Sequence, residues 1–280
     1  MTTASCDHPL DRRSFRAIAD LAYRESGLTL VKEKSSMIQS RLRPRLKVLG
    51  LRDFAQYSAF VQSDAGEDER KQLISALTTN VTHFFRESHH FATLGNVLDA
   101  RMDDLRKGAR MRIWSAGCSN GQEAYSAAIS LLERCPEAAQ YDLRILATDI
   151  DPQVIAFARR GKYGERLMAG VSEPLRDGYF DAERDRKGER QFTVKPEVKN
   201  LIHFNELNLL SAWPMRGSFD VIFCRNVVIY FDVATQTSLW PRFLKALRPT
   251  GHLFLGHSER IATPEAIGFC SDGPTSYRPL

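Results

Sequence analysis

The sequence of 280 residues predicts an α/β protein that is preceded by an all-α N-terminal domain. Residues 14–78 contain only segments with helical spacing, whereas residues 111–151 alternate strand, loop, helix and strand. The apolar stretch SFDVIFCRNVVIYF is continuous, as expected for a central parallel strand that is buried on both faces. The length and the hydrophobic content of 43% favour two domains, which we place at 1–78 and 79–280.

The N-terminal domain is predicted to consist of short amphipathic helices. Phe15, Ile18 and Ala22 recur at helical spacing in a segment that ends at Gly27, a suitable C-terminal cap. A basic helix follows over residues 34–52, and DFAQYSAFVQ and ERKQLISALTTN form two more. Nothing before Thr79 suggests catalysis, so we expect this domain to have another role.

The basic helix over residues 34–52 contains no acidic residue. At about 100° per residue its apolar side chains form one arc with basic residues on both flanks. The basic residues form either a solvated face or a docking surface for an acidic, helical partner, and the absence of acidic residues favours docking slightly. Pro44 should kink the helix or start a new one. The candidate docking residues are Lys34, Arg41, Arg45 and Arg52 on one flank and Arg43 and Lys47 on the other.

The junction TTNVTHFFRESHHF joins the two predicted domains and is dense in polar and aromatic residues. Asn80, Thr82 and Arg86 can reach forward into a site, while the paired phenylalanines anchor the segment. The helix that follows should run to about Arg106 and end at Lys107-Gly108, just before the first strand.

Residues 111–151 are expected to hold a ligand. Gly117 and Gly121 bracket a short polar loop where the backbone can approach a ligand closely, although this is not the G-x-G-x-x-G pattern. Asp149 follows the second strand 28 positions after Gly121, close to the spacing that places a carboxylate on ribose hydroxyls. Asp151 precedes Pro152 and is better explained as a helix N-cap. A βαβ unit without any ligand remains an alternative.

Glu123 narrows the choice of ligand. An acidic residue in the first turn of a helix is favoured by the helix dipole alone, so Glu123 can be purely structural. It would, however, repel a pyrophosphate at that helix N-terminus. A ligand without phosphate, such as S-adenosylmethionine (SAM), suits this loop better.

The C-terminal half is predicted to complete the main sheet around an insertion. Residues 161–200 are glycine-punctuated and charged, and QFTVKPEVKNLIHF alternates like a β-hairpin with KPEVKN as its turn. We therefore expect an inserted β-subdomain over about 161–205. The chain then returns to the main sheet and ends one strand at Asn208-Leu209 and the central strand at Arg225-Asn226. A helix ended by Pro249 and a final strand GHLFLGHSE follow.

Composition restricts the remaining classes. The five cysteines, at 6, 118, 135, 224 and 270, show no metal-binding spacing, and their odd number argues against a disulfide framework. Adjacent His89 and His90 diverge by about 100° on a helix, so we expect no metal. The N-terminus lacks a signal-peptide core and no apolar run is long enough to span a bilayer, so a cytoplasmic protein is expected. The net charge of +5 favours an acidic partner.

Six stretches occur in the order found in one known family. They are TTNVTHFFRE, IWSAGCSNGQEAYS, ILATDID, NLLSAW, FDVIFCRNVVIYFD and LRPTGHLFLGHSE, of which the first and fifth are the most specific. The sequence resembles the chemotaxis receptor methyltransferases (CheR), which are SAM-dependent protein-glutamate O-methyltransferases. The resemblance covers nearly the whole chain. It implies a Rossmann-like methyltransferase domain with an inserted small antiparallel β-subdomain, preceded by the all-α domain.

The resemblance also implies roles for particular residues. Asn80, Thr82 and Arg86 would contact SAM, Glu123 its amino end and Asp149 its ribose; Asn208, Leu209, Arg225 and Asn226 would line its adenine and methionine side. The product would be S-adenosylhomocysteine. The basic helix would bind the cytoplasmic helices of chemoreceptors. Thr250 stands where a glycine is common, a tolerable change in a loop. Some members also bind a receptor C-terminal tether through a glycine-rich insert, but DAERDRKGER stands there, so tether binding is doubtful.

Transfer of a methyl group to a carboxylate requires no general base, because a glutamate is already ionised at neutral pH. Tyr230, Arg101 and Arg106 are weak candidates for orienting the acceptor. Methylation of RNA or of a small molecule, and a SAM-binding adaptor without activity, remain alternatives. No aromatic-interleaved basic platform for nucleic acid is visible. We expect a monomer.

Overall fold

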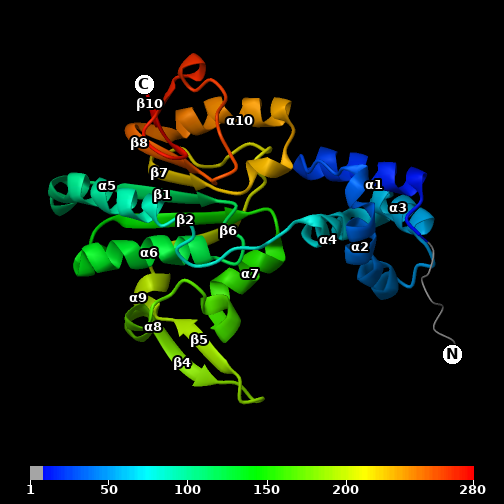
Figure 1. The fold of residues 1–280 in the computed structure, drawn as a ribbon, viewed down its shortest axis with the longest axis horizontal. Helices are drawn as coiled ribbons and strands as arrows, with labels where there is room; N and C mark the ends of the chain where they lie inside the picture. The colour runs from blue at the N-terminus through cyan, green and yellow to red at the C-terminus, as the bar shows by residue number, and fades with distance from the viewer. Residues whose placement is uncertain (1–8) are drawn as a thin grey trace. The chain divides into compact units, whose positions relative to one another are not determined.

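The computed structural model describes residues 9–280 (Figure 1), so Cys6 and the first residues lie outside it. Its contacts divide the chain into two units. The first contains the residues up to Thr79 together with Tyr230–Thr235, and the second contains Asn80–Ile229 and Gln236–Leu280. The inclusion of Tyr230–Thr235 in the helical unit was not expected, because this segment directly follows the central strand region in the sequence. None of the described helices is long and apolar enough to cross a membrane.

The first unit is helical. Its helices are α1 (Arg12–Ser26), α2 (Ser35–Leu49), α3 (Phe54–Gln62) and α4 (Glu67–Leu77), with 3-10 turns at Lys32–Lys34 and Asp64–Gly66. Asp11 caps α1 by accepting hydrogen bonds from the backbone amides of Arg13 and Ser14. Helix α2 continues through Pro44 to Leu49 and does not restart there. Ile38 and Leu46, on either side of the proline, are both fully buried, and this packing holds the two halves in one helix.

The second unit is built on a seven-stranded sheet in the order β6-β2-β1-β7-β8-β10-β9. Its strands are β1 (Met111–Ala116), β2 (Leu143–Asp149), β6 (Ile202–Glu206), β7 (Phe219–Cys224), β8 (Leu247–Leu255), β9 (Phe269–Ser271) and β10 (Ser276–Pro279). The five strands from β6 to β8 are parallel, whereas β10 pairs antiparallel with both β8 and β9. Chain order reverses between β1 and β7, and open α/β sheets bind ligands at such a reversal.

Helices cover both faces of this sheet, as Figure 1 shows. They are α5 (His89–Arg106), α6 (Gln122–Arg134), α7 (Pro152–Arg160) and α10 (Val233–Ala246), with 3-10 turns at Pro136–Gln140, Val228–Tyr230 and Glu265–Ile267. Ile113 belongs to the core that includes residues of α5 and α6, while neighbouring Trp114 packs against Phe243 of α10. Successive residues of a strand face opposite sides, so β1 is buried on both faces.

The small sheet has the order β3-β5-β4 and is antiparallel, which confirms the predicted insertion. Its elements are β3 (Lys162–Gly164), β4 (Phe180–Arg184) and β5 (Arg190–Val194), with the 3-10 turn Glu165–Met168 and helices α8 (Glu173–Tyr179) and α9 (Pro196–Lys199). Phe192 of β5 is buried. Because β3, β4 and β5 pair only with one another, the insertion forms a sheet of its own.

Two expectations about the C-terminal half were wrong. KPEVKN is not a hairpin turn: Pro196 starts helix α9, and the strands on either side of it belong to different sheets. Proline at the first helical position with an acidic residue after it is a helix-start pattern that we overlooked. Helix α10 ends at Ala246 and not at Pro249, and strands β9 and β10, which follow the expected final strand, were missed.

Candidate functional site

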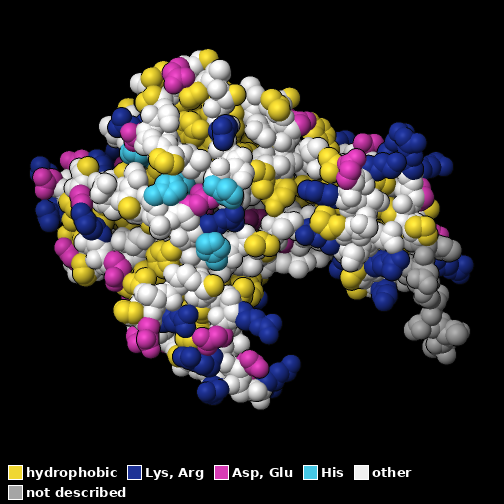
Figure 2. Space-filling view, viewed as in Figure 1, with side chains coloured by type: hydrophobic (Ala, Val, Ile, Leu, Met, Phe, Trp, Pro, Cys, Tyr) yellow, Lys and Arg dark blue, Asp and Glu magenta, His cyan; other side chains and the backbone are white. Residues whose placement is uncertain are grey.

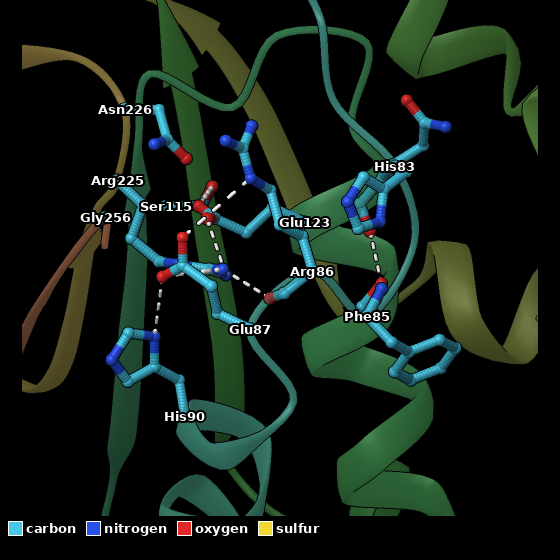
Figure 3. Close-up of polar contacts among 12 residues, drawn as sticks. His83, Phe85, Arg86, Glu87, His90, Ser115, Glu123, Arg225, Asn226 and Gly256 are labelled. Carbon is cyan, nitrogen blue, oxygen red and sulfur yellow. Dashed lines mark hydrogen bonds and ion pairs between the residues drawn. The ribbon is translucent and has the colours of Figure 1, made fainter. Parts of the chain in front are cut away.

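The candidate site lies at the carboxyl ends of β1 and β7, where the strand order reverses (Figure 3). The loop after β1 turns at Gly117, which has a φ of 87°. The amide of Gly117 donates to the Thr148 carbonyl at 2.7 Å. A Cβ on Gly117 would lie 2.3 Å from Cγ2 of Val227, so the loops after β1 and β7 touch at a position that only glycine can occupy.

A buried ion cluster, formed by Arg225, Glu123 and Glu87, occupies this end of the sheet. Arg225, whose side chain is 1% exposed, lies 3.2 Å from Glu123 and 3.3 Å from Glu87. Its guanidinium also donates to the Arg86 carbonyl. Ser115, the penultimate residue of β1, donates to Glu123 at 2.7 Å. The cluster therefore joins β1, β7, the first turn of α6 and the junction before α5 (Figure 3).

Burial affects the acidic groups of the site unequally. It raises the pKa of Glu123, against the opposing influence of Arg225. Burial also acts to raise the pKa of Glu87, but Arg225 and the donors of His257 outweigh it and hold this pKa below its usual value. Burial raises the pKa of Glu259, which accepts hydrogen bonds from the amides of Gly256 and Asn226 at 2.6 and 2.7 Å. Two carboxylates, Glu87 and Glu123, thus pair with one buried guanidinium, and Glu259 is held by backbone amides nearby.

Asp149 and Asp151 have the separate positions that the sequence indicated. Asp151 is the N-cap of α7, accepting from the amide of Gln153, and also accepts from the Asn80 amide group at 3.2 Å. Asp149 is 8% exposed and accepts from the amides of Ser119 and Asp151, at 2.8 and 3.0 Å. Burial raises the pKa of Asp149 to about 6. Each carboxylate oxygen has a second lone pair, so Asp149 can still accept hydrogen bonds from a ligand.

The junction before α5 holds Arg86 between two residues in the left-handed region, Phe85 at φ 54° and Glu87 at φ 55°. Such conformations persist only where the surroundings fix them. The amide of Phe85 donates to the Ser126 hydroxyl at 2.9 Å, and Glu87 is held by Arg225. The Arg86 side chain keeps 26% exposure and contacts the Val81 carbonyl at 3.3 Å. Thr82, four residues earlier, is half-buried.

The segment after β6 reaches the same edge of the sheet. The amide of Leu207 donates to the Asp149 carbonyl at 2.9 Å, which places Asn208 and Leu209 next to the end of β2. The Asn208 side chain accepts from the amide of Leu210 at 2.9 Å, and Leu209 is buried. Asn226, at φ 59°, follows Arg225 at the end of β7. These contacts place Asn80, Asp149, Asn208 and Leu209 around the end of β2. Glu123 and Asn226 lie at the end of β7 beside Arg225, which is buried in the ion cluster.

Arg101 and Arg106 are not brought to this site. Arg101 lies 3.2 Å from Asp220 at the start of β7 and donates to the Arg110 carbonyl just before β1. Arg106, in the same last turns of α5, pairs with Asp103. Both arginines therefore belong to the amino edge of the parallel strands and cannot orient an acceptor at the carboxyl edge. Tyr230 belongs to the helical unit, where its hydroxyl lies 3.4 Å from the Thr79 carbonyl.

The basic helix α2 has two kinds of arginine. Arg41 donates to the carbonyls of Leu77 and Thr78, and Arg45 forms a bidentate ion pair with Glu69 at 2.9 and 2.6 Å. Both side chains bind α2 to α4, so the expectation that this flank is a free docking surface was wrong for them. The remaining candidates differ: Lys34, Lys47 and Arg52 are exposed, while the half-buried Arg43 has a buried Nε without a hydrogen bond. Figure 2 shows many Lys and Arg side chains on the surface of the helical unit.

Four residues of the site were not singled out from the sequence: Glu87, Ser115, His257 and Glu259. Glu87 and Glu259 lie in the stretches FFRE and GHSE, whose acidic residues stand beside polar turns after apolar segments. An acidic residue in such a position could have been predicted to be buried. The sequence does not show that Glu87 and His257 interact, because they are far apart in the chain. In the structure the His257 amide donates a hydrogen bond to Glu87 at 3.1 Å. Among the described residues, no three His, Cys, Asp or Glu side chains are grouped to hold a metal.

The fold and the site together define a class. The loop GCSNGQ after β1 has no basic residue, and an acidic residue opens the helix that follows, which disfavours a phosphate there. Glu123 and Asp149 are carboxylates with raised pKa values, so an additional positive charge beside them is stabilising. SAM has a sulfonium, an ammonium and a ribose but no phosphate, and it therefore fits a site with these two carboxylates. These are the features of a SAM-dependent methyltransferase.

Comparison with known proteins identifies the family. Residues 80–272 match the domain described as "CheR methyltransferase, SAM binding domain", and residues 13–78 match "CheR methyltransferase, all-alpha domain". A "Probable chemotaxis protein methyltransferase" of Rhizobium etli is 47% identical over 92% of this chain and 96% of its own length. "Chemotaxis protein methyltransferase 2" of Pseudomonas aeruginosa is 38% identical over 96% and 93%, and the Escherichia coli "Chemotaxis protein methyltransferase" is 38% identical over 94% and 89%. The chain belongs to the CheR methyltransferase family, and its cofactor is SAM.

Proposed function

We propose that this enzyme transfers the methyl group of SAM to glutamate side chains of chemoreceptors, forming glutamyl methyl esters and S-adenosylhomocysteine. One observation carries the proposal: in a domain of the CheR family, two buried carboxylates share one arginine at the point where the strand order reverses. The names of its relatives support a chemotaxis substrate. The choice of glutamate oxygen as the acceptor rests on the resemblance and on the chemistry that follows.

The residues proposed to hold the cofactor surround the carboxyl edge. Glu123 would bind the amino end and Asp149 the ribose hydroxyls, through lone pairs that their internal partners leave unused. Asn80 and Thr82 would close the site from the junction, with Arg86 beside them. Asn208, Leu209 and Asn226 would line the adenine and methionine side. Arg225 would act from behind, as the cation that keeps Glu123 ionised.

When bound, SAM supplies a methyl group on a positively charged sulfur. The acceptor glutamate is already ionised at neutral pH, with an ordinary pKa near 4.3, so no residue has to remove a proton. The protein has to align the acceptor and exclude water, because the two opposite charges disappear during transfer. Tyr230 remains a candidate for orienting the acceptor: its hydroxyl has only a long contact of 3.4 Å and can donate elsewhere.

We propose that receptors dock on the basic residues of α2 and its two ends, namely the exposed Lys34, Lys47 and Arg52 and the half-buried Arg43. Arg41 and Arg45 would maintain the helix position. A receptor tether on the β-subdomain remains doubtful. The β4–β5 turn is compact, since Asp185 accepts from the amides of Lys187 and Glu189 at 2.8 and 2.9 Å. Its residues carry both signs of charge and replace the glycine-rich insert of tether-binding members.

The deciding experiment is transfer of labelled methyl from SAM to chemoreceptor-containing membranes, with release of methanol in base as the readout. Base-labile label on a receptor band would establish glutamyl methyl esters. Base-stable label would indicate another acceptor atom. SAM binding without label on any receptor of the native host would contradict the proposal and favour another substrate or an adaptor role.

A further inference from the structure

A second polar pocket lies beside the edge strand β6, outside the proposed SAM site. Its volume is about 360 Å³, and the residues that matter here are Arg159 of α7, Lys199 of α9, and His203 and Asn205 of β6. No residue proposed to bind SAM lines it. The volume falls at the lower end of the range of about 300–1,000 Å³ that small-ligand sites occupy.

The two cations of this pocket are fixed by the backbone. Arg159 donates from Nε and Nη2 to the Phe204 carbonyl, at 3.2 and 2.5 Å, on the free edge of β6. Lys199 donates from Nζ to the Arg160 carbonyl at 2.8 Å. A guanidinium has five N–H donors and an ammonium three, so both keep donors for a ligand. Their positions are set before any ligand arrives, which lowers the entropy cost of binding.

In the described part of the chain, neither cation of this pocket forms an ion pair. Within residues 9–280, neither Arg159 nor Lys199 has an acidic side chain in ion-pair distance, and the pocket lining contains no Asp or Glu. Burial lowers the pKa of Lys199, with Asp181 opposing the effect. Arg159 is exposed and Lys199 is half-buried, whereas the half-buried Arg101 and the buried Arg225 are paired with carboxylates. The pocket therefore holds two positive charges that no carboxylate of its lining pairs with.

We propose that this pocket binds a phosphate group, either free or as part of a small ligand. A guanidinium and an ammonium beside polar donors match the tetrahedral oxygens of phosphate, which accept several charge-assisted hydrogen bonds at once. Asn205 and His203 supply further polar contacts from β6. The function of the site is separate from methyl transfer, since it uses none of the SAM-binding residues.

The test is calorimetric titration of the full-length protein with orthophosphate and with pyrophosphate, in chloride buffer of low ionic strength. We expect binding that weakens with added salt and is stronger for pyrophosphate. Lys199→Gln and Arg159→Gln should each weaken binding roughly tenfold, the usual effect of removing one charged donor. Arg160→Gln is the matched control, because Arg160 lies next to Arg159 but contributes only its carbonyl.

Thermal unfolding separates loss of the site from loss of the fold. Should Lys199→Gln unfold, Lys199→Arg, which keeps the charge, is expected to fold and to bind phosphate. Binding of ribose 5-phosphate that is tighter than that of orthophosphate would identify a larger ligand, and equal binding a free anion. The proposal is overturned if wild-type protein does not bind either anion, if Lys199→Gln and Arg159→Gln bind unchanged, or if Arg160→Gln weakens binding equally.

Discussion

Each unit contains a buried carboxylate bound by an arginine, but the two clusters are constructed differently. In the helical unit, Glu69 is 5% exposed and accepts two hydrogen bonds from Arg45, at 2.9 and 2.6 Å, and one from the Tyr57 hydroxyl at 2.9 Å. These three residues lie on the helices α2, α3 and α4. One cation, one anion and a neutral donor satisfy one another, so this cluster is closed.

The cluster of the second unit is open. Arg225 pairs with both Glu123 and Glu87, at the longer distances of 3.2 and 3.3 Å. The three residues come from the end of β7, the first turn of α6 and the junction before α5. Glu87 is in the left-handed backbone region, and the pKa of Glu123 is raised by burial. A closed cluster stabilises packing of the fold, whereas an open cluster retains negative charge that a cationic ligand can use.

The largest effect is expected from the arginines. Arg225→Met leaves two carboxylates without their cation and should lower the free energy of unfolding by about 3–5 kcal/mol and abolish SAM binding. Arg45→Met removes a partner that is itself 24% exposed, so about 1–3 kcal/mol is expected with SAM binding retained. Urea unfolding measures the loss of stability of each variant, and titration with SAM measures its binding. Arg225→Lys keeps a charge and serves as the folded control; intact SAM binding in Arg225→Met would remove the proposed role of the cluster.

The carboxylates should respond in opposite ways. Glu123→Gln removes a charge whose pKa burial already raises, so stability should stay level or increase. The same change should weaken SAM binding about 10–100-fold, because a hydrogen bond to a charged ligand group is lost. Glu69→Gln disrupts three hydrogen bonds and should cost about 1–3 kcal/mol without altering SAM affinity. Equal responses of the two variants would show that the clusters do not differ in kind.

The pKa of Asp149 predicts a pH dependence. Since burial raises this pKa to about 6, the ligand-free protein binds a proton here more tightly than the unfolded chain does. The Asp149 contribution to stability therefore falls as pH rises from about 4 to 6. SAM affinity should change in the opposite sense and weaken several-fold as pH falls through about 6. Titrations across this range should show both trends in the wild type and neither in Asp149→Asn; identical profiles would exclude Asp149 as the source.

The smallest effect is expected on the exposed face of the helical unit. Lys47→Glu should raise the KM for receptor several-fold, because it opposes an acidic partner, and leave SAM affinity and stability unchanged. Lys71→Glu, an exposed charge reversal on α4, is the matched control. Labelled-methyl kinetics at varied receptor concentration provide the measurement. A similar KM for both variants would argue against docking on α2.

The sequence alone predicted those helices and strands whose local residue pattern agrees with the final fold. Continuous apolar runs fixed the buried strands β1, β2 and β7, and Gly27 and Asp151 marked helix ends that the structure confirms. The family motifs also contained Glu123, Asp149 and Arg225, which the structure places at the carboxyl edge of the sheet. These features are recognisable because periodicity and capping depend on residues close together in the chain.

The tertiary structure decided how the charges are used. From the sequence, Arg41, Arg45 and Lys47 were all docking candidates, on two flanks of one helix, and Arg101 was a candidate for orienting the acceptor. Their partners lie at Leu77, Glu69 and Asp220. A long side chain binds whichever acceptor folding brings near it, and helical angles do not indicate which flank faces another helix. The separation of β5 from β6 was hidden for the same reason: strand pairing is a non-local interaction, and the alternation of apolar residues is the same in either sheet.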